Sequence, residues 1–366
     1  MLYFHRPQIL QKEDTARLET IVTESFPDGK SIDHCLWCET GIEYAEYLCT
    51  ERCDALLIGL LPYAILKGHD ISSDTPATLE LLYKIKEIWL PLLLQTSKKA
   101  HPIRLNIPTA NDKLPNQGAV GTGISLGIDS LYTIQRHAQN SDSLVKLTHL
   151  GYFNVGSHGR GAEATQLNET HLQKVQAFSR EYGYKLVVVN SNFMDEFRQH
   201  YKTIHVYASA FAVFSLQKLW SDYFYASAGF FAGGNGYQNW EKKACGDYSL
   251  VLQGIISTSN LRFHADAEDA TRFQKTASLS NSPIAQKQLF VCIQDTDNCC
   301  RCKKCVRTIL TLKALGVRDR FNSVFDPRKE SFWSNLKWLL KGIKKRDFYI
   351  MEIVKYFFSG KKKCSR

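Results

Sequence analysis

Apolar and polar residues in the central part of the chain alternate between the period of a strand and the period of a helix. Short apolar runs within Val120–Ile124, Leu144–Val155 and Lys185–Asn190 predict buried strands. Stretches with helical apolar spacing, 131–138 and 163–182, separate them. Strands that alternate with helices indicate an α/β fold, here a doubly wound, mainly parallel sheet with helices on both faces.

The pattern continues towards the C-terminal side. His205–Trp220 reads as a further helix and Tyr223–Ala226 as a further strand. Gly229–Trp240, rich in glycine and aromatic residues, predicts a loop over a ligand crevice. His158 and His205 are candidate acid–base groups because imidazole titrates near neutral pH, although a structural role is the commoner alternative for a single histidine.

The first 115 residues carry a different pattern, which predicts a helix-rich α+β region. Helical apolar spacing recurs over Ala55–Leu66 and Leu79–Leu94. Thr109–Gln117 is rich in Asn and Pro, which is typical of a domain boundary. We therefore expect an N-terminal α+β region (1–115) followed by the sheet domain (116–318).

A basic helical tail, residues 319–366, follows the sheet domain. Phe332–Lys345 and Phe348–Phe358 are amphipathic and precede the lysines 361–363. Such a face suits an anionic membrane surface or nucleic acid. A packed helix pair with a solvated lysine end is the alternative, and it is favoured because it is commoner.

The stretch Gly121–Ser130 joins the first central strand to its helix. Its glycines permit a close approach of the backbone to a ligand or a positive φ angle. Amides at the start of the helix, together with the helix dipole, favour a phosphate. A strand-to-helix turn with a Ser or Asp cap is the alternative. The candidate ligand-binding residues of this stretch are Gly123, Ser125, Gly127, Asp129 and Ser130.

Two further segments are expected beside this stretch. Ligands of open parallel sheets bind beyond the carboxyl ends of the strands. Asn154–His158 and Asn190–Asn192 follow the next two predicted strands, so they should line the same crevice, with Asn154 among the ligand-binding residues.

The chain has 366 residues, 11 cysteines and a formal net charge of +10. No signal-peptide layout and no apolar run long enough to span a bilayer is seen, so we expect a cytoplasmic protein. The positive charge suggests an anionic partner such as a nucleotide, a nucleic acid or a membrane surface. In that setting cysteines indicate metal or thiol chemistry rather than disulfides.

The densest cysteine group has the spacing Cys292-x6-Cys299-x2-Cys302-x2-Cys305, with Cys300 as an extra thiol. Two successive C-x2-C steps and a fourth thiolate suit a tetrahedral zinc ion, Zn²⁺. Four thiolates leave no open coordination position, so the expected role is structural. An iron–sulfur cluster is the alternative, because it also takes four thiolates.

A second metal site can be drawn from cysteines in the first region. Cys35-x2-Cys38 and Cys49-x3-Cys53 lie near His34. Free cysteine commonly behaves as a small core residue, and we favour that interpretation here.

Two motifs resemble those of known enzymes. Ser125-Leu-Gly-Ile-Asp-Ser130 resembles the SGGxDS loop of the PP-loop ATP pyrophosphatases, with Leu126 where the family has glycine. Asn298-Cys-Cys-Arg-Cys-Lys-Lys-Cys-Val-Arg307-Thr resembles the NCGxCxxCxRT segment of proteins similar to 7-cyano-7-deazaguanine synthase, with Cys300 at the glycine position. The resemblance extends over about residues 118–318 and implies a HUP/PP-loop type of sheet domain with a four-cysteine zinc knuckle.

The resemblance also implies an activity. Members of the family cleave ATP to AMP and pyrophosphate while they activate a substrate, and the enzyme named above converts a carboxylate, with ammonia, to an amide and then a nitrile. By this resemblance the cofactors would be ATP, Mg²⁺ and Zn²⁺, with zinc on Cys292, Cys299, Cys302 and Cys305. Asp129 would lie near the magnesium ion, and Lys275 would stabilise charge on the phosphates or on the adenylate.

We therefore expect an ATP-dependent, C–N bond-forming ligase that adenylates a carboxylate or carbonyl group and couples it to ammonia or another nucleophile. Its partner would be a small molecule or a modified nucleobase, and the protein could form a homodimer. One alternative is a tRNA-modifying sulfur transferase on the same fold, with a persulfide on Cys300. The other is a non-catalytic nucleotide-binding protein.

Overall fold

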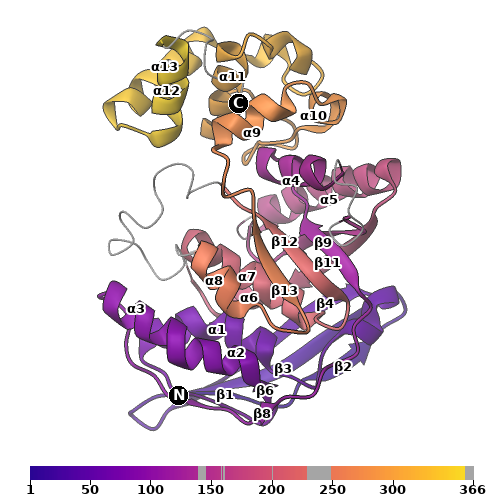
Figure 1. The fold of residues 1–366 in the computed structure, drawn as a ribbon, viewed down its shortest axis with the longest axis vertical. Helices are drawn as coiled ribbons and strands as arrows, with labels where there is room; N and C mark the ends of the chain where they lie inside the picture. The colour runs from indigo at the N-terminus through magenta and orange to yellow at the C-terminus, as the bar shows by residue number, and fades with distance from the viewer. Residues whose placement is uncertain (139–145, 158, 160, 200, 229–248, 359–366) are drawn as a thin grey trace.

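One sheet of eleven strands runs through the molecule and takes strands from both sides of residue 115. The computed structural model describes residues 1–138, 146–157, 159, 161–199, 201–228 and 249–358 (Figure 1). His158 and the predicted loop Gly229–Trp240 lie outside these residues.

Five strands at one end of this sheet are all parallel, as the alternation of strands and helices predicts. Its strands lie in the order β13-β12-β9-β10-β11, and every neighbouring pair is parallel. The five strands are β9 (Ala119–Gly123), β10 (His149–Asn154), β11 (Lys185–Ser191), β12 (Trp220–Ala226) and β13 (Arg262–Asp266).

Helices pack on both faces of the parallel strands. On one face, Val120 and Leu150 join a hydrophobic cluster with α4 (Ile128–Ala138) and α5 (Ala162–Tyr182). On the other face, Trp220 joins a cluster with α1 (Asp54–Lys67), α7 (Tyr201–Ser215) and α8 (Ser249–Ile256). Successive side chains of a strand point to opposite faces, so β9, β10, β11 and β12 contribute to both clusters.

Two boundaries differ from the sequence-based expectation. The helix predicted over His205–Trp220 ends at Ser215, and Trp220 begins β12. The short helix α6 (Phe193–Glu196) also precedes α7. The end of α7 and the start of β12 are both apolar and buried. The hydrophobic pattern therefore does not mark the boundary between the helix and the strand.

The first 115 residues contain more strand than the helix-rich pattern predicted. The strands β3 and β4 form a long antiparallel hairpin in which buried and exposed positions alternate. That two-residue period is the mark of a half-buried strand. The strands of this region in the large sheet are β1 (Leu2–Phe4), β2 (Gln8–Gln11), β3 (Thr15–Ser25), β4 (Ser31–Gly41), β5 (Ile71–Ser73) and β7 (Leu105–Asn106).

The helices of this region are close to those expected. Asp54–Lys67 forms α1, and Leu79–Thr96 forms one helical stretch. Its parts are α2 (Leu79–Lys84), the π-helical turn η2 (Ile85–Trp89) and α3 (Leu90–Thr96). The 3-10 helix η1 (Ile42–Tyr47) follows β4, and β6 (Ala77–Thr78) pairs with β8 (Thr109–Ala110) in a separate small sheet.

The first region and the parallel strands share one sheet and one core. β4 pairs in antiparallel orientation with β11. The helix α1 packs on α7, and both belong to the larger hydrophobic cluster. The sheet thus continues across the boundary expected near residue 115.

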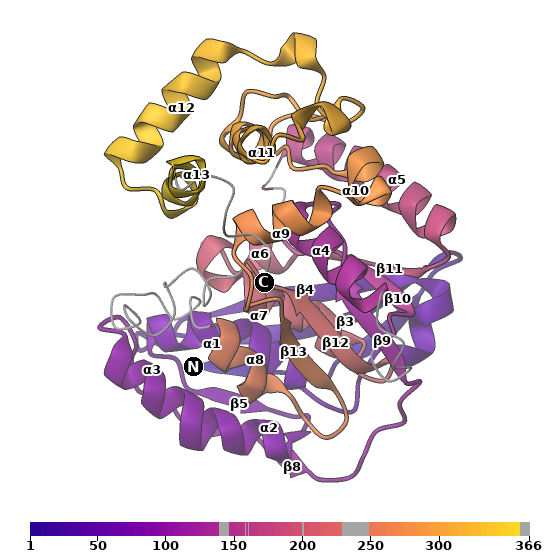
Figure 2. The same ribbon diagram turned by 45° about the horizontal axis from the view of Figure 1, so that its top comes forward.

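The C-terminal helices gather at the end of the molecule opposite α1–α3 (Figures 1 and 2). Phe273, Ile350 and Ile353 form a small hydrophobic cluster that packs the last helix against the others. These helices are α9 (Arg272–Leu279), α10 (Pro283–Gln288), α11 (Lys303–Ala314), α12 (Phe332–Lys344) and α13 (Phe348–Phe358). Among the described helices, none has both the length and the apolar character needed to span a bilayer.

Candidate functional site

The order of the parallel strands places a topological switch point between β9 and β12. From β9 the chain continues to β10 on one side, whereas from β12 it continues to β13 on the other side. Ligands of open α/β sheets bind in the crevice outside the carboxyl ends of the strands at such a point. The candidate site is therefore built from the segments that follow β9 and β12.

The segment after β9 is held in one conformation by its own polar groups and by neighbours. Ser130 Oγ donates to the Gly127 carbonyl oxygen at 3.2 Å and lies 3.3 Å from Ser125 Oγ. His171 Nε2 of α5 lies 3.0 Å from the Ser125 carbonyl oxygen. The helix α4 begins directly afterwards at Ile128, so amides of its first turn lack intrahelical acceptors and are oriented for an anion.

The glycines of this segment serve packing rather than unusual backbone angles. None of Gly121, Gly123 and Gly127 has a positive φ angle. Of the two roles expected for these glycines, the positive φ angle is therefore wrong. A Cβ atom at Gly121 would lie 2.3 Å from the buried Trp220 ring, which explains the need for glycine there. The positive φ of the segment, 52°, belongs to Leu126, whose side chain is buried.

Asp129 and Lys275, the two predicted catalytic residues, are brought together. Lys275 Nζ lies 3.8 Å from Asp129 Oδ1, although the residues belong to different helices, α4 and α9. Arg272, one turn before Lys275 on α9, forms an ion pair with the other carboxylate oxygen of Asp129. Asp129 Oδ1 is buried and has no hydrogen-bond partner.

Lys275 connects this carboxylate to the end of β12. Its ammonium group is fully buried and donates a hydrogen bond to the Ser227 carbonyl oxygen at 2.6 Å. Ser227 follows β12 directly, and its hydroxyl donates to Glu268, which follows β13. Burial lowers the pKa of Lys275, and the nearby Asp129 carboxylate opposes this effect. The contacts of Lys275 thus span the switch point.

Two arginines complete the site, and sequence reasoning did not select them. Arg307 on α11 stacks over the Tyr349 ring of α13, with 4.3 Å from the guanidinium carbon to the ring centroid. Arg272 lies over the same ring at 5.7 Å. Burial, and then repulsion by Arg272, lower the pKa of Arg307 to about 10. Arg307 belongs to the cysteine motif of the sequence, whereas nothing in the sequence distinguishes Arg272.

The asparagines behave differently from one another. Asn154 ends β10 and donates to Asn190 Oδ1 of β11 at 3.2 Å, so both lie at the carboxyl edge. Asn192 instead bonds to the backbone of β4, accepting from the Trp37 amide at 2.9 Å. His205 on α7 lies with Nδ1 2.7 Å from the Tyr225 hydroxyl. Asn190 therefore lies at the carboxyl edge of the sheet, as expected for the crevice, whereas Asn192 is bound to the β3–β4 hairpin instead.

Four cysteines form a candidate metal centre near the segment that follows β9, where the Phe290 amide donates to the Leu126 carbonyl oxygen at 2.9 Å. The Sγ atoms of Cys292, Cys299, Cys302 and Cys305 are buried and lie within 4.8 Å of one another. A tetrahedral ion with Zn–S bonds of about 2.3 Å places its sulfurs about 3.8 Å apart, and Cys299 and Cys305 are separated by 4.0 Å. A multi-iron cluster holds its thiolates farther apart. The four thiols can therefore hold a single metal ion such as zinc.

Backbone amides and one asparagine shape this centre. The amides of Cys302 and Cys305 point to Cys299 Sγ and Cys302 Sγ at 3.3 and 3.5 Å, an arrangement that stabilises thiolates. The buried Asn298 accepts from the Cys292 amide at 3.2 Å and donates to the Leu289 and Val324 carbonyl oxygens. Cys300 is not a member of the centre; it has a φ of 57° and is fully buried.

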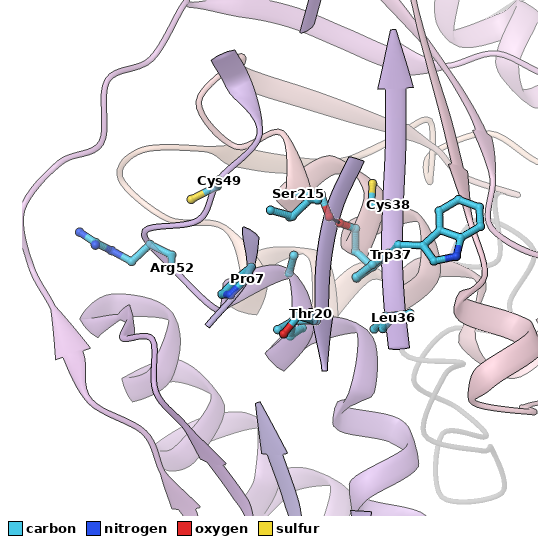
Figure 3. Close-up of a pocket in the computed structure, with 12 residues that line it drawn as sticks. Pro7, Thr20, Leu36, Trp37, Cys38, Cys49, Arg52 and Ser215 are labelled. Carbon is cyan, nitrogen blue, oxygen red and sulfur yellow. Dashed lines mark hydrogen bonds between the residues drawn. The ribbon is translucent and has the colours of Figure 1, made fainter. Parts of the chain in front are cut away.

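The cysteines of the first region do not form a second centre. Among the described residues, only the C-terminal four come together as a metal-binding group. Cys38 and Cys49 instead line an apolar cavity with Leu36, Trp37 and Phe211 (Figure 3). Burial raises the pKa of both thiols to about 12, which suits inert core residues. The favoured interpretation of core thiols is thus confirmed for Cys38, Cys49 and Cys53, which are buried, but it is wrong for Cys35, which is exposed on β4.

Comparison with family models, with curated proteins and with solved structures gave no match for this chain. The functional argument therefore depends on the geometry of the site and on the motifs of the sequence.

Proposed function

We propose that the protein is an ATP-dependent enzyme of the PP-loop ATP pyrophosphatase type, which adenylates a carboxylate or carbonyl substrate and transfers the activated group to ammonia or another nucleophile. The observation that carries this proposal is the meeting of Asp129, Lys275 and the start of α4 at the switch point between β9 and β12. This is where an α/β sheet binds a nucleotide.

The chemistry needs positioning and charge stabilisation more than covalent catalysis. A substrate oxygen would form a bond to the α-phosphorus of ATP while the bond to the bridging oxygen breaks and pyrophosphate leaves. The nucleophile would then bond to the activated carbon, AMP would leave, and the proton of the nucleophile would pass to solvent. In this proposal the amides at the start of α4 and the Lys275 ammonium group would stabilise negative charge on the phosphates.

The residues present fit the proposed metal ions. Mg²⁺ usually binds one or two carboxylates together with substrate phosphates, and Asp129 Oδ1, which accepts no hydrogen bond, offers one such ligand. When bound, the ion would neutralise phosphate charge. The four-cysteine centre would hold zinc in a structural role, because four thiolates fill a tetrahedral shell.

Two backbone angles support the motif resemblance. Leu126 and Cys300 are the positions at which the two family motifs carry glycine. Both have positive φ angles, 52° and 57°, in the region that favours glycine. A glycine at either position would adopt the same backbone without strain.

Of the alternatives, the sulfur transferase is less favoured. A persulfide carrier must reach its substrate, whereas Cys300 is fully buried. The non-catalytic alternative shares the binding site with the enzyme, so it is separated by an assay of the reaction.

The test is release of pyrophosphate from ATP in the presence of Mg²⁺, ammonium and a panel of carboxylate compounds. Asp129→Asn should abolish release, because it removes the charge that Arg272 and Lys275 contact. Asp269→Asn is the matched control, since Asp269 is exposed and pairs with Arg136 on the outer side of α4. Equal rates in the Asp129→Asn variant and the wild type would refute the proposal.

The exposed surface of α12 suggests where the protein lies in the cell. α12 exposes Phe332, Trp333 and Leu340 together with Lys337 and Lys341. Aromatic and basic residues on one helix surface are typical of helices that lie in the interface of an anionic membrane. We propose that this surface of α12 contacts such a membrane while the rest of the protein stays in the cytoplasm.

A further inference from the structure

We propose that Arg272 and Arg307 form an anion subsite that binds the pyrophosphate end of the nucleotide. This inference rests on the proposed function for the position of the nucleotide, and it assigns a role to two residues outside the resembling loop. Figure 2 shows the helices α9, α11 and α13, which pack on one another. The lining of the subsite comes from these helices and includes Arg272, Thr276, Arg307, Thr308, Tyr349 and Glu352.

The charges of this region do not balance. Arg272 and Lys275 share a single carboxylate, Asp129. Arg307 has no ion pair with any described residue: its guanidinium group stacks on the Tyr349 ring and is repelled by Arg272, while the carboxylates of Asp129 and Asp347 act on it only from beyond ion-pair distance. Buried cations are normally paired, so an excess of positive charge indicates a missing anion.

The one other carboxyl group of the subsite does not restore the balance. Burial raises the pKa of Glu352, which favours its neutral form. Its Oε1 accepts a hydrogen bond from the Thr271 hydroxyl, and its Oε2 is buried without a partner. Glu352 is therefore engaged with the start of α9 rather than with Arg307.

Hydrogen-bond donors point to the same missing partner. The Nε atoms of Arg272 and Arg307 are both buried, and neither has an acceptor among the described residues. A guanidinium group recognises phosphate oxygens through paired N–H donors in a fixed plane. Tyr349 fixes that plane, because the Arg307 guanidinium stacks on its ring. Phosphate oxygens would satisfy donors that the protein leaves unmet.

Pyrophosphate fits better than a single carboxylate from the acceptor substrate. Arg272 already contacts Asp129, which lies in the first turn of α4, so the subsite adjoins the position expected for the phosphates. Several cations close together match a multiply charged anion. A carboxylate would leave most of this charge unpaired.

The experiment is isothermal titration calorimetry with pyrophosphate, without magnesium, on the full chain. Arg307→Met should weaken binding at least tenfold while the melting temperature is kept or raised, because an unpaired buried cation is removed. Arg320→Met is the control: it removes the same charge from an exposed residue on the neighbouring 3-10 helix η6 (Arg318–Phe321). The affinity of the Arg320→Met variant for pyrophosphate should equal that of the wild type.

The outcomes separate this inference from the proposed function. Unchanged pyrophosphate affinity in Arg307→Met, or no pyrophosphate binding by the wild type, would overturn the subsite. If ATP still binds the wild type and drives pyrophosphate release in that case, the proposed function stands without the subsite. Binding of acetate that depends on Arg307, with none of pyrophosphate, would assign the arginines to the acceptor carboxylate and also overturn it.

Discussion

Leu126 and Cys300 adopt a backbone conformation that costs a non-glycine residue about 1–2 kcal/mol. In Cys300→Gly, relief of this cost should largely offset loss of the small buried side chain. We expect the melting temperature to stay within about 3 °C of the wild type. Bound zinc, measured by elemental analysis, should stay at one ion per chain, whereas Cys302→Ser should lose it.

Cys300→Ser addresses the sulfur transferase at the same position. If Cys300 carried a persulfide, this variant would lose all activity but keep its zinc. We expect pyrophosphate release to persist, because the thiol is buried and outside the metal centre.

The lowered pKa of the buried Lys275 should make the stability of the protein depend on pH. Its pKa is lowered from 10.5 by burial, so between the lowered value and 10.5 the unfolded chain binds a proton that the folded chain does not. The free energy of unfolding therefore gains a contribution that rises with pH across this window. Lys275→Met should remove that contribution.

The measurement is urea unfolding of both proteins at pH 7 and pH 10. The stability of the wild type relative to Lys275→Met should increase at the higher pH. A decrease would mean that the Asp129 contact outweighs burial and raises the pKa instead.

At the scale of elements, α11 joins the metal centre to the proposed anion subsite. Cys302 caps its first turn, Cys305 lies in that turn and Arg307 follows. Removal of the metal should therefore loosen α11 and weaken pyrophosphate binding, although no thiolate contacts the anion. Structural zinc contributes directly to folding free energy.

We expect the metal-free protein to melt roughly 10 °C lower or more. Hydrogen exchange should quicken in residues 292–314 and stay unchanged in the β3–β4 hairpin. Restored zinc should reverse both effects, and a metal-free protein with native stability would exclude a structural role.

The elements that could be predicted from the sequence are those with a strong local period. The strands β9, β10, β11 and β12 and the helices α1, α5, α12 and α13 follow from apolar spacing alone, whereas β13 was not predicted. The β3–β4 hairpin was missed, because its alternation is mixed with polar residues such as Thr20 and Glu24 that are buried through hydrogen bonds.

The site depends on contacts that no local pattern contains. Lys275 meets Asp129 because β12 inserts beside β9, and strand order is set by the whole sheet. The motif resemblance suggested both residues, but not the Arg272 ion pair. Arg272 has an ordinary place in a helix, and only the packing of α9 against α4 gives it a partner.

At the scale of the whole molecule, the ends differ in character. The first region continues the sheet through β4 and packs α1 on α7, so it stabilises the parallel strands from the side away from the C-terminal helices. The C-terminal part of the molecule contains the four clustered cysteines and the two arginines of the proposed subsite. Figure 2 shows α12 farther from the sheet than α13, and the exposed residues of α12 include Phe332, Trp333 and Leu340.

This arrangement predicts binding to anionic vesicles. Phe332 and Trp333 are 71% and 75% exposed, and burying two such side chains in the interface is worth a few kcal/mol. In sedimentation with phosphatidylglycerol vesicles, Phe332→Ser with Trp333→Ser should weaken binding roughly tenfold or more. Tyr83→Ser, which removes an exposed aromatic ring from α2 at the other end of the molecule, should leave vesicle binding unchanged.

Because α12 also exposes Lys337 and Lys341, vesicle binding should fall when salt is added and when neutral phosphatidylcholine replaces the anionic lipid. Equal sedimentation of all three proteins, or equal binding to anionic and neutral vesicles, would refute the proposal that α12 contacts an anionic membrane.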